Sequence, residues 1–140
     1  MLKIGDLLGG KYRILSVVGR GGMSTVYLAR NERANKNWAV KEVRKSGVNQ
    51  DQVVEQSLLT EVEIMKHLNN PHLPSIIDVI DIDDTFVIVM DFVEGNSLEK
   101  VLEHGSVSEI QVIDLAKQLC DVLLYLHSCN PPIIYRDMKP

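Results

Sequence analysis

Apolar and polar residues alternate over short stretches of the first ninety residues, which is the pattern of β-strands. These stretches are rich in β-branched and aromatic residues, and turn-forming residues separate them. The pattern predicts five strands after a lead-in at residues 1–11. The predicted strands are Tyr12 to Val18, Thr25 to Arg30, Trp38 to Val43, Ile76 to Ile82 and Thr85 to Phe92.

Between the third and fourth strands, apolar residues recur every three or four positions, which predicts a helix over residues 49–69. Asn69-Asn70-Pro71 ends it. Glu61 shares the apolar face of this helix, and a carboxylate in such a place needs a partner. Lys41 on the third strand is the candidate, whereas the simpler alternative leaves Glu61 at the edge of the face, in water. The face consists of Val54, Leu58, Val62, Met65 and Leu68.

The last third of the chain is predicted to be mainly helical. Leu98 to Glu103 forms a short helix, and Ser108-Glu109-Ile110-Gln111 has the form of a capping box that starts a long one over residues 109–128. Pro131-Pro132 ends the long helix, and Ile133-Ile134-Tyr135 predicts a short strand.

The most informative stretch is the glycine-rich turn between the first two strands. Gly19, Gly21 and Gly22 lie there, and glycine lets backbone N–H groups approach a ligand without a Cβ in the way. A strand rather than a helix follows, which excludes the usual dinucleotide-binding turn. No Gly-Lys-Ser/Thr closes the turn, which excludes a P-loop. The pattern instead predicts a hairpin tip that covers phosphates, with Lys41 placed to contact them.

The composition and charge of the chain exclude several classes of protein. The chain has 140 residues, 45% of them apolar, and a formal net charge of −4, which indicates one globular domain without a general nucleic-acid surface. No apolar run approaches the roughly 18 residues of a membrane span, and the first residues do not resemble a signal peptide. Cys120 and Cys129 lie too far apart along one helix to form a disulfide, which suits a reducing compartment. We therefore expect a cytoplasmic location. The sequence leaves open whether a longer protein would carry a membrane span further along. The four histidines lack ligand spacing, so we expect structural roles for them rather than a metal site.

Four motifs together resemble those of protein kinases, specifically the bacterial eukaryotic-like serine/threonine type. They are Gly19-x-Gly21-x-x-Ser24-x-Val26, Ala39-Val40-Lys41, Glu61 followed by Pro71-His72-Leu73, and Tyr135-Arg136-Asp137-Met138-Lys139-Pro140. The resemblance covers essentially the whole chain. It implies an α+β fold, in which residues 1–90 form an N-lobe with a five-stranded antiparallel sheet and one regulatory helix. Residues 91–97 would be a hinge, and residues 98–140 would begin a mainly helical C-lobe that is truncated within the catalytic loop.

The resemblance also implies roles for particular residues in binding ATP and transferring its γ-phosphate to Ser/Thr hydroxyls of proteins. Asp137 would accept the proton of the substrate hydroxyl, Lys139 would lie near the transferred phosphoryl group, and Lys41, held by Glu61, would contact the α- and β-phosphates. The backbone of the glycine-rich turn would cover the phosphates, and Asp91 and Val93 would offer backbone groups to the edge of the adenine. Ser97 is open to two interpretations, a ribose contact or a helix cap. The residues implied in nucleotide binding are Gly19, Gly21, Gly22, Met23, Val26, Ala39, Lys41, Met90, Asp91, Val93 and Ser97.

The chain departs from the family in three places. Ser24 replaces the third glycine of the turn, and Tyr135 stands where the family usually has a histidine before Arg136. The chain also ends before the asparagine and Asp-Phe-Gly motif that hold Mg²⁺ in the family. We therefore expect residues 1–140 alone to be inactive, with the Mg²⁺ ligands beyond residue 140. A non-catalytic nucleotide-binding or scaffolding pseudokinase is the alternative. The apolar face of the long helix also leads us to expect self-association, with helix exchange between chains as one route.

Overall fold

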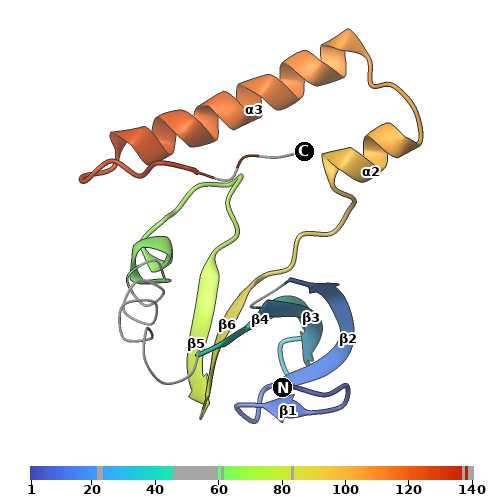
Figure 1. Ribbon diagram of the computed structural model, residues 1–140, viewed down its shortest axis with the longest axis vertical. Coiled ribbons are helices and arrows are strands. Elements are labelled where there is room, and N and C mark those ends of the chain that lie inside the picture. Colours follow the sequence, from blue (N-terminus) through green and yellow to red (C-terminus); the bar gives the residue numbers. More distant parts are fainter. Residues whose placement is uncertain (22–23, 46–59, 61, 83, 137, 139–140) are drawn as a thin grey trace. The chain divides into compact units, whose positions relative to one another are not determined.

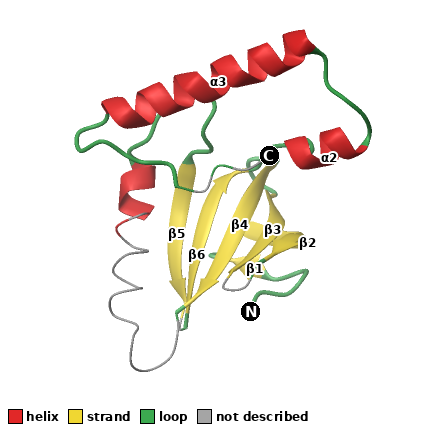
Figure 2. Ribbon diagram, turned by 45° about the horizontal axis from the view of Figure 1, so that its top comes forward, coloured by secondary structure: helices red, strands yellow, loops and turns green. Residues whose placement is uncertain are grey.

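A six-stranded antiparallel sheet dominates the first part of the chain. The computed structural model describes residues 1–21, 24–45, 60, 62–82, 84–136 and 138. The strands neighbour one another in the order β1-β2-β3-β4-β6-β5, and the sheet is curled (Figures 1 and 2). Their bounds are β1 Leu7–Leu8, β2 Tyr12–Arg20, β3 Ser24–Asn31, β4 Lys36–Arg44, β5 Ile76–Ile82 and β6 Thr85–Asp91.

All five predicted strands are present, and the sixth strand, β1, was not predicted. β1 is only two residues long and pairs with the start of β2. Two residues are too few to show an alternation, so the pattern assigned them to a lead-in. β2 carries two bulges, between Ile14 and Ser16 and between Val17 and Gly19.

The alternation along the strands gives the sheet two different faces. On β3 and β4, Thr25, Tyr27, Trp38, Val40 and Glu42 are buried, while the residues between them are only half-buried. The buried face carries the main hydrophobic core, which we call the core face. Its cluster consists of Leu8, Tyr12, Ile14, Tyr27, Ala29, Trp38, Val40, Val87 and Val89, with Leu2, Ile80 and Ile82 packed against it.

A helical segment packs against the opposite face. Residues 60 and 62–66 are helical, and Val62, which is 3% exposed, joins Val43 of β4 and Ile88 of β6 in a second hydrophobic cluster. Met65 and Leu68 are half-buried, whereas Ile64 is exposed. The predicted apolar face of this helix is therefore confirmed for the residues that the structure describes. Val54, Leu58 and most of the predicted helix lie outside them.

The first residues of the chain belong to the core face rather than to a free lead-in. The backbone N–H of Leu2 donates a hydrogen bond to Oε1 of Glu42 at 3.0 Å, and the N-terminal ammonium lies 3.3 Å from the same oxygen. The hydroxyl of Tyr27 donates to Oε2 of Glu42 at 2.9 Å and lies 3.2 Å from the carbonyl oxygen of Leu2. Glu42 is 3% exposed, so its carboxylate is a buried charge that backbone and side-chain donors surround.

The rest of the chain forms a second unit. Contacts divide the chain into Met1–Asn69 with Pro74–Val93, and Asn70–Leu73 with Glu94–Pro140. The second unit contains α2 (Leu98–Glu103) and α3 (Glu109–Ser128), both with the predicted bounds. Ser97 caps α2, and Ser108 with Gln111 forms the predicted capping box at the start of α3. Neither α3 nor any other helix of the described residues is long and apolar enough to cross a membrane.

The strand predicted at residues 133–135 is wrong. Residues 133–135 have no regular secondary structure, and the backbone N–H of Ile133 donates to the carbonyl of Leu126 at 3.0 Å. Ile134 and Tyr135 are exposed, 69% and 51% respectively. A strand needs a neighbour to receive its backbone hydrogen bonds, and here the end of α3 takes that place.

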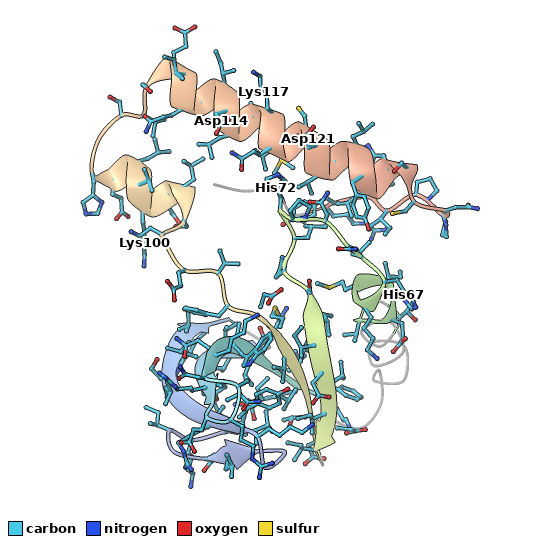
Figure 3. The ribbon with its side chains drawn as sticks, turned by 180° about the vertical axis from the view of Figure 1, so that it is seen from behind. His67, His72, Lys100, Asp114, Lys117 and Asp121 are labelled. Atoms are coloured by element: carbon cyan, nitrogen blue, oxygen red, sulfur yellow. The ribbon has the colours of Figure 1, made fainter. Side chains whose placement is uncertain are left out.

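Two of the histidines take the structural roles that were predicted. Nδ1 of His67, labelled in Figure 3, donates to the carbonyl of Glu63, and Nδ1 of His104 donates to the carbonyl of Lys100, each at 2.7 Å. Each ring therefore satisfies a carbonyl near the end of a helix. Both cysteines are free thiols.

Candidate functional site

The end of β2 and the turn that leads to β3 carry glycines that the local fold does not require. A Cβ added to Gly19 would meet nothing within 4 Å, and one added to Gly21 would make only ordinary contacts of 3.7 Å with Ser24. Neither residue has a positive φ. The N–H of Gly21 donates to the carbonyl of Ser24 at 2.8 Å, which closes the turn. The missing side chains therefore leave open space above the turn, as the predicted close approach of a ligand needs.

Four predicted site residues share the face opposite the core. Val26 on β3 pairs directly with Lys41 on β4, and Ala39 on β4 pairs directly with Met90 on β6. Directly paired residues project to the same side of a sheet, and all four are half-buried. Three strands thus bring residues 26, 39, 41 and 90 together into one patch, which we call the site face. Gly19 pairs with Val26, so the glycine turn adjoins this patch.

Lys41 is the cation among the four residues of the site face. It pairs with Val26 on one side and with Ile88 on the other, so its neighbours across the strands are apolar. Within the described ranges no carboxylate forms an ion pair with Lys41. Its predicted partner, Glu61, lies outside those ranges, although the next residue, Val62, is buried against the sheet. The Lys41–Glu61 pair therefore stays a prediction.

The end of β6 supplies the next predicted residues. Met90 is half-buried and packs against the cluster of Val62 and Ile88, so it connects the site face to the helix. The N–H of Asp91 donates to the carbonyl of Ser75 at 3.0 Å, so any backbone contact of Asp91 with a ligand would come from its carbonyl oxygen. Val93 follows in irregular backbone and is 73% exposed.

The side chain of Asp91 is held by two donors. Oδ2 accepts the N–H of Ser75 at 3.0 Å, and Oδ1 lies 3.3 Å from Nζ of Lys36. The hydrogen bond from Ser75 and then the ammonium of Lys36 hold the pKa of the Asp91 carboxyl below its ordinary value of 3.8, against the opposing effect of partial burial. Asp91 is therefore ionised at neutral pH. Sequence reasoning assigned Asp91 only a backbone role and missed this side-chain arrangement.

The remaining predicted site residues lie either outside the described ranges or in the second unit. Gly22, Met23, Glu61, Asp137 and Lys139 lie outside the residues that the structure describes. Ser97 belongs to the second unit, where its hydroxyl accepts the N–H of Lys100 at 3.3 Å and caps α2. The helix-cap interpretation of Ser97 is therefore confirmed, and the ribose contact stays a prediction.

Val18 of β2 directly precedes the glycines, and the sequence predicted it as the end of a strand rather than as a residue of the site. It lies within the second bulge of β2, directly before Gly19, and is 55% exposed. A bulge adds a residue to one strand and breaks the alternation of sides. In the sequence, Val18 is marked only by being apolar and directly before the glycines. Ordinary alternation would assign such a residue to the interior of a strand.

The described residues contain no group of three or more His, Cys, Asp or Glu side chains that could hold a metal ion. Two of the three acidic residues of α3, Asp114 and Asp121, follow one another along the helix with Lys117 between them (Figure 3). Asp114 accepts a hydrogen bond from Gln118 at 2.8 Å, so this carboxylate has a partner within the helix.

Comparison with known proteins gives one consistent result. The sequence model of the protein kinase domain matches residues 12–140. Myosin light chain kinase A of Dictyostelium discoideum is 35% identical over 130 residues, which are 92% of this chain and 43% of that protein. The serine/threonine-protein kinase PrkC of Bacillus subtilis is 31% identical over 138 residues, 98% of this chain and 21% of that protein. The chain thus spans less than half the length of these relatives.

A solved structure shows the same fold. The crystal structure of Rad53 1–466 in complex with AMP-PNP matches with a TM-score of 0.77 and 28% sequence identity. The match covers 92% of this chain and 33% of the Rad53 chain. The fold of this chain is therefore one that a larger, known protein also contains.

Proposed function

The chain belongs to the protein kinase family, and from this premise we propose that its site face binds ATP as the first part of a serine/threonine protein kinase catalytic domain. The observation that carries the proposal is the convergence of Val26, Ala39, Lys41 and Met90 on one face of three strands, beside a glycine turn with open space. The similar Rad53 structure is a complex with AMP-PNP, which supports a nucleotide as the ligand.

Each part of the site face has a role in this proposal. Val26 and Ala39 offer apolar contact to the adenine ring, and Met90 closes the patch where the helix packs. Asp91 and Val93 offer backbone groups to the edge of the purine. Lys41, a half-buried cation among apolar neighbours, neutralises the α- and β-phosphates.

Phosphoryl transfer needs more than this patch, because it depends on positioning and on metal ions that neutralise charge. We propose, from the resemblance, that Asp137 accepts the proton of a protein Ser or Thr hydroxyl and that Lys139 stabilises the transferred group. Glu61 would hold Lys41, and the backbone of Gly22 and Met23 would complete the cover over the phosphates. The ligands of Mg²⁺ would lie beyond residue 140, so the 140-residue chain alone would not transfer phosphate.

The test is nucleotide binding by the 140-residue chain, measured by isothermal titration with ATP. Lys41→Met is expected to weaken ATP binding about tenfold or more, because it removes a charge-assisted contact to phosphate. Lys66→Met is the matched control, since Lys66 is an exposed residue that pairs with Glu63. Equal affinities of the two variants would contradict the role of Lys41. Transfer of labelled phosphate to a protein by the 140-residue chain, lost in Lys41→Met, would contradict the predicted inactivity.

We also propose that the 140-residue chain associates with a second copy through α3. Leu115, Leu119 and Leu124 are 38%, 46% and 71% exposed, and Ile110 is 80% exposed, whereas Leu126 is buried. Apolar surface of this kind on one helix favours association. Sedimentation velocity over a range of concentrations is expected to show a dimer that Leu124→Glu weakens. A monomer at every concentration would contradict the proposal.

A further inference from the structure

A small polar cluster lies at the end of β6, where the sheet gives way to irregular backbone. It consists of Asp91, Ser75 and Lys36, together with Trp38. Asp91 and Ser75 exchange two hydrogen bonds, one between their backbones and one from the N–H of Ser75 to Oδ2 of Asp91, both 3.0 Å long. Lys36 approaches the other carboxylate oxygen to 3.3 Å. One residue of β6 thus holds the segment before β5 and the first residue of β4 at the same time.

Trp38 extends this cluster into the core. It pairs directly with Asp91 across β4 and β6 and is 9% exposed. Nζ of Lys36 lies 4.1 Å from the centre of its ring, a cation–π distance. Lys36 is therefore fixed from two sides, by a carboxylate and by an aromatic face, although its own side chain is more than half exposed.

The cluster lies at the point where the regular hydrogen bonding of the sheet ends. Asp91 is the last residue of β6, and residues 92–94 that follow have no regular secondary structure. The ladder between β4 and β6 ends at the pair Trp38 and Asp91. Beyond that pair, backbone hydrogen bonds of the sheet no longer hold the chain, so the side chain of Asp91 is the last described anchor before Val93.

We propose that Asp91 is a positioning residue, whose carboxylate fixes the backbone of residues 91–93 so that it can contact the edge of a purine. The inference rests on the proposed nucleotide-binding function. Ordering a backbone segment before a ligand arrives removes that cost from the binding step. The charge of Asp91 at neutral pH keeps both of its oxygens as acceptors for Ser75 and Lys36.

The experiment compares two ligands that differ in whether they have a purine. ATP would use both the phosphate contacts and the positioned backbone, whereas inorganic tripolyphosphate has only phosphates. Affinities of the 140-residue chain for both are measured for the wild type and for Asp91→Ala, Asp91→Asn and Lys36→Met. Asp91→Asn keeps an acceptor for Ser75 but loses the charge, and Lys36→Met keeps an apolar stem over Trp38 but loses the ammonium. Circular dichroism in the far ultraviolet reports whether each variant is folded, since the variants alter the surroundings of Trp38 and would change its emission in a folded chain.

Asp91→Ala is expected to weaken ATP binding about tenfold, and Asp91→Asn and Lys36→Met about threefold. Tripolyphosphate affinity is expected to stay unchanged in all three variants. An equal loss for both ligands would overturn the inference, because it would mean general damage to the fold. Unchanged ATP affinity in Asp91→Ala would overturn it as well, with the proposed function intact. A wild-type chain that binds tripolyphosphate but prefers it to ATP would instead contradict the proposed function, and the inference with it.

Discussion

Replacing Glu42 with alanine is expected to lower the free energy of unfolding by about 3 kcal/mol, because the variant removes a charged acceptor that a buried hydroxyl and a part-buried backbone N–H share. The hydroxyl of Tyr27 and the N–H of Leu2 both donate to Glu42, at 2.9 and 3.0 Å. Tyr27 is 2% exposed, so in the variant its hydroxyl keeps only the longer contact of 3.2 Å with the carbonyl of Leu2 among the described acceptors. Urea unfolding followed by circular dichroism would measure the change, and the midpoint of thermal unfolding should fall by roughly 10 °C.

Two further variants separate the effect of the charge of Glu42 on stability from the effect of its burial. Glu42→Gln keeps an acceptor of nearly the same shape, so we expect it to cost less than half as much as the alanine variant. Glu32→Ala is a matched surface control, since the side chain of Glu32 is 61% exposed and pairs only with Arg13 among the described residues. We expect that change to cost less than about 1 kcal/mol. Similar costs for Glu42→Ala and Glu32→Ala would show that the residues at the start of the chain are not anchored through Glu42.

The contact between Tyr27 and Glu42 predicts that the stability of the fold depends on pH at alkaline pH. Burial, and then the hydrogen bond to Glu42, raise the pKa of the Tyr27 hydroxyl above its ordinary value of 10.0. The folded state therefore holds the proton of Tyr27 more tightly than the unfolded state does. This contribution to stability is fully present below pH 10 and is lost as the pH rises through the folded-state pKa. Tyr27→Phe should be less stable at neutral pH, and its stability should depend less steeply on pH above pH 10.

The elements that sequence predicted best are those whose signals are local. α2 and α3 have the predicted bounds, because Ser97 and Ser108 provide caps that can be recognised within four residues. β5 also has the predicted bounds, since its alternating residues and flanking turns lie within one short stretch. β1 and the segment at 133–135 show the limit of this reasoning. Whether two or three apolar residues form a strand depends on a neighbouring strand that the local pattern does not contain.

The candidate site also has parts that the sequence predicted and parts that it could not predict. Spacing and residue type predicted that the glycine turn adjoins Lys41, and the direct pairs of Gly19 with Val26 and of Val26 with Lys41 have that arrangement. The carboxylate of Glu42 could not be predicted as buried, because its partner Leu2 lies forty residues away. The side-chain bonds of Asp91 to Lys36 and Ser75 join residues 55 and 16 positions apart. Such contacts follow from the way the strands pair and curl rather than from any motif.

Changing Val62 to aspartate is expected to detach the 62–66 helix from the sheet and to cost about 3–4 kcal/mol of unfolding free energy. Val62 is 3% exposed and contacts the cluster that Val43 and Ile88 form on the side of the sheet opposite the main core. A carboxylate there would be buried among apolar side chains, so the helix would have to leave the sheet to hydrate it. Loss of the valine side chain adds the cost of a poorly filled interface.

Ile64→Asp is the matched control for this prediction. Ile64 lies two positions further along the same helix and is 42% exposed. Both variants place aspartate near the C-terminal end of one helix, so they share the same costs in helix propensity and in the helix dipole. The difference between them therefore isolates burial, and we expect Ile64→Asp to cost about 1 kcal/mol or less. Urea unfolding of both variants measures that difference. Equal losses would mean that the helix does not pack by Val62, and the Lys41–Glu61 pair would then lose the arrangement on which it depends.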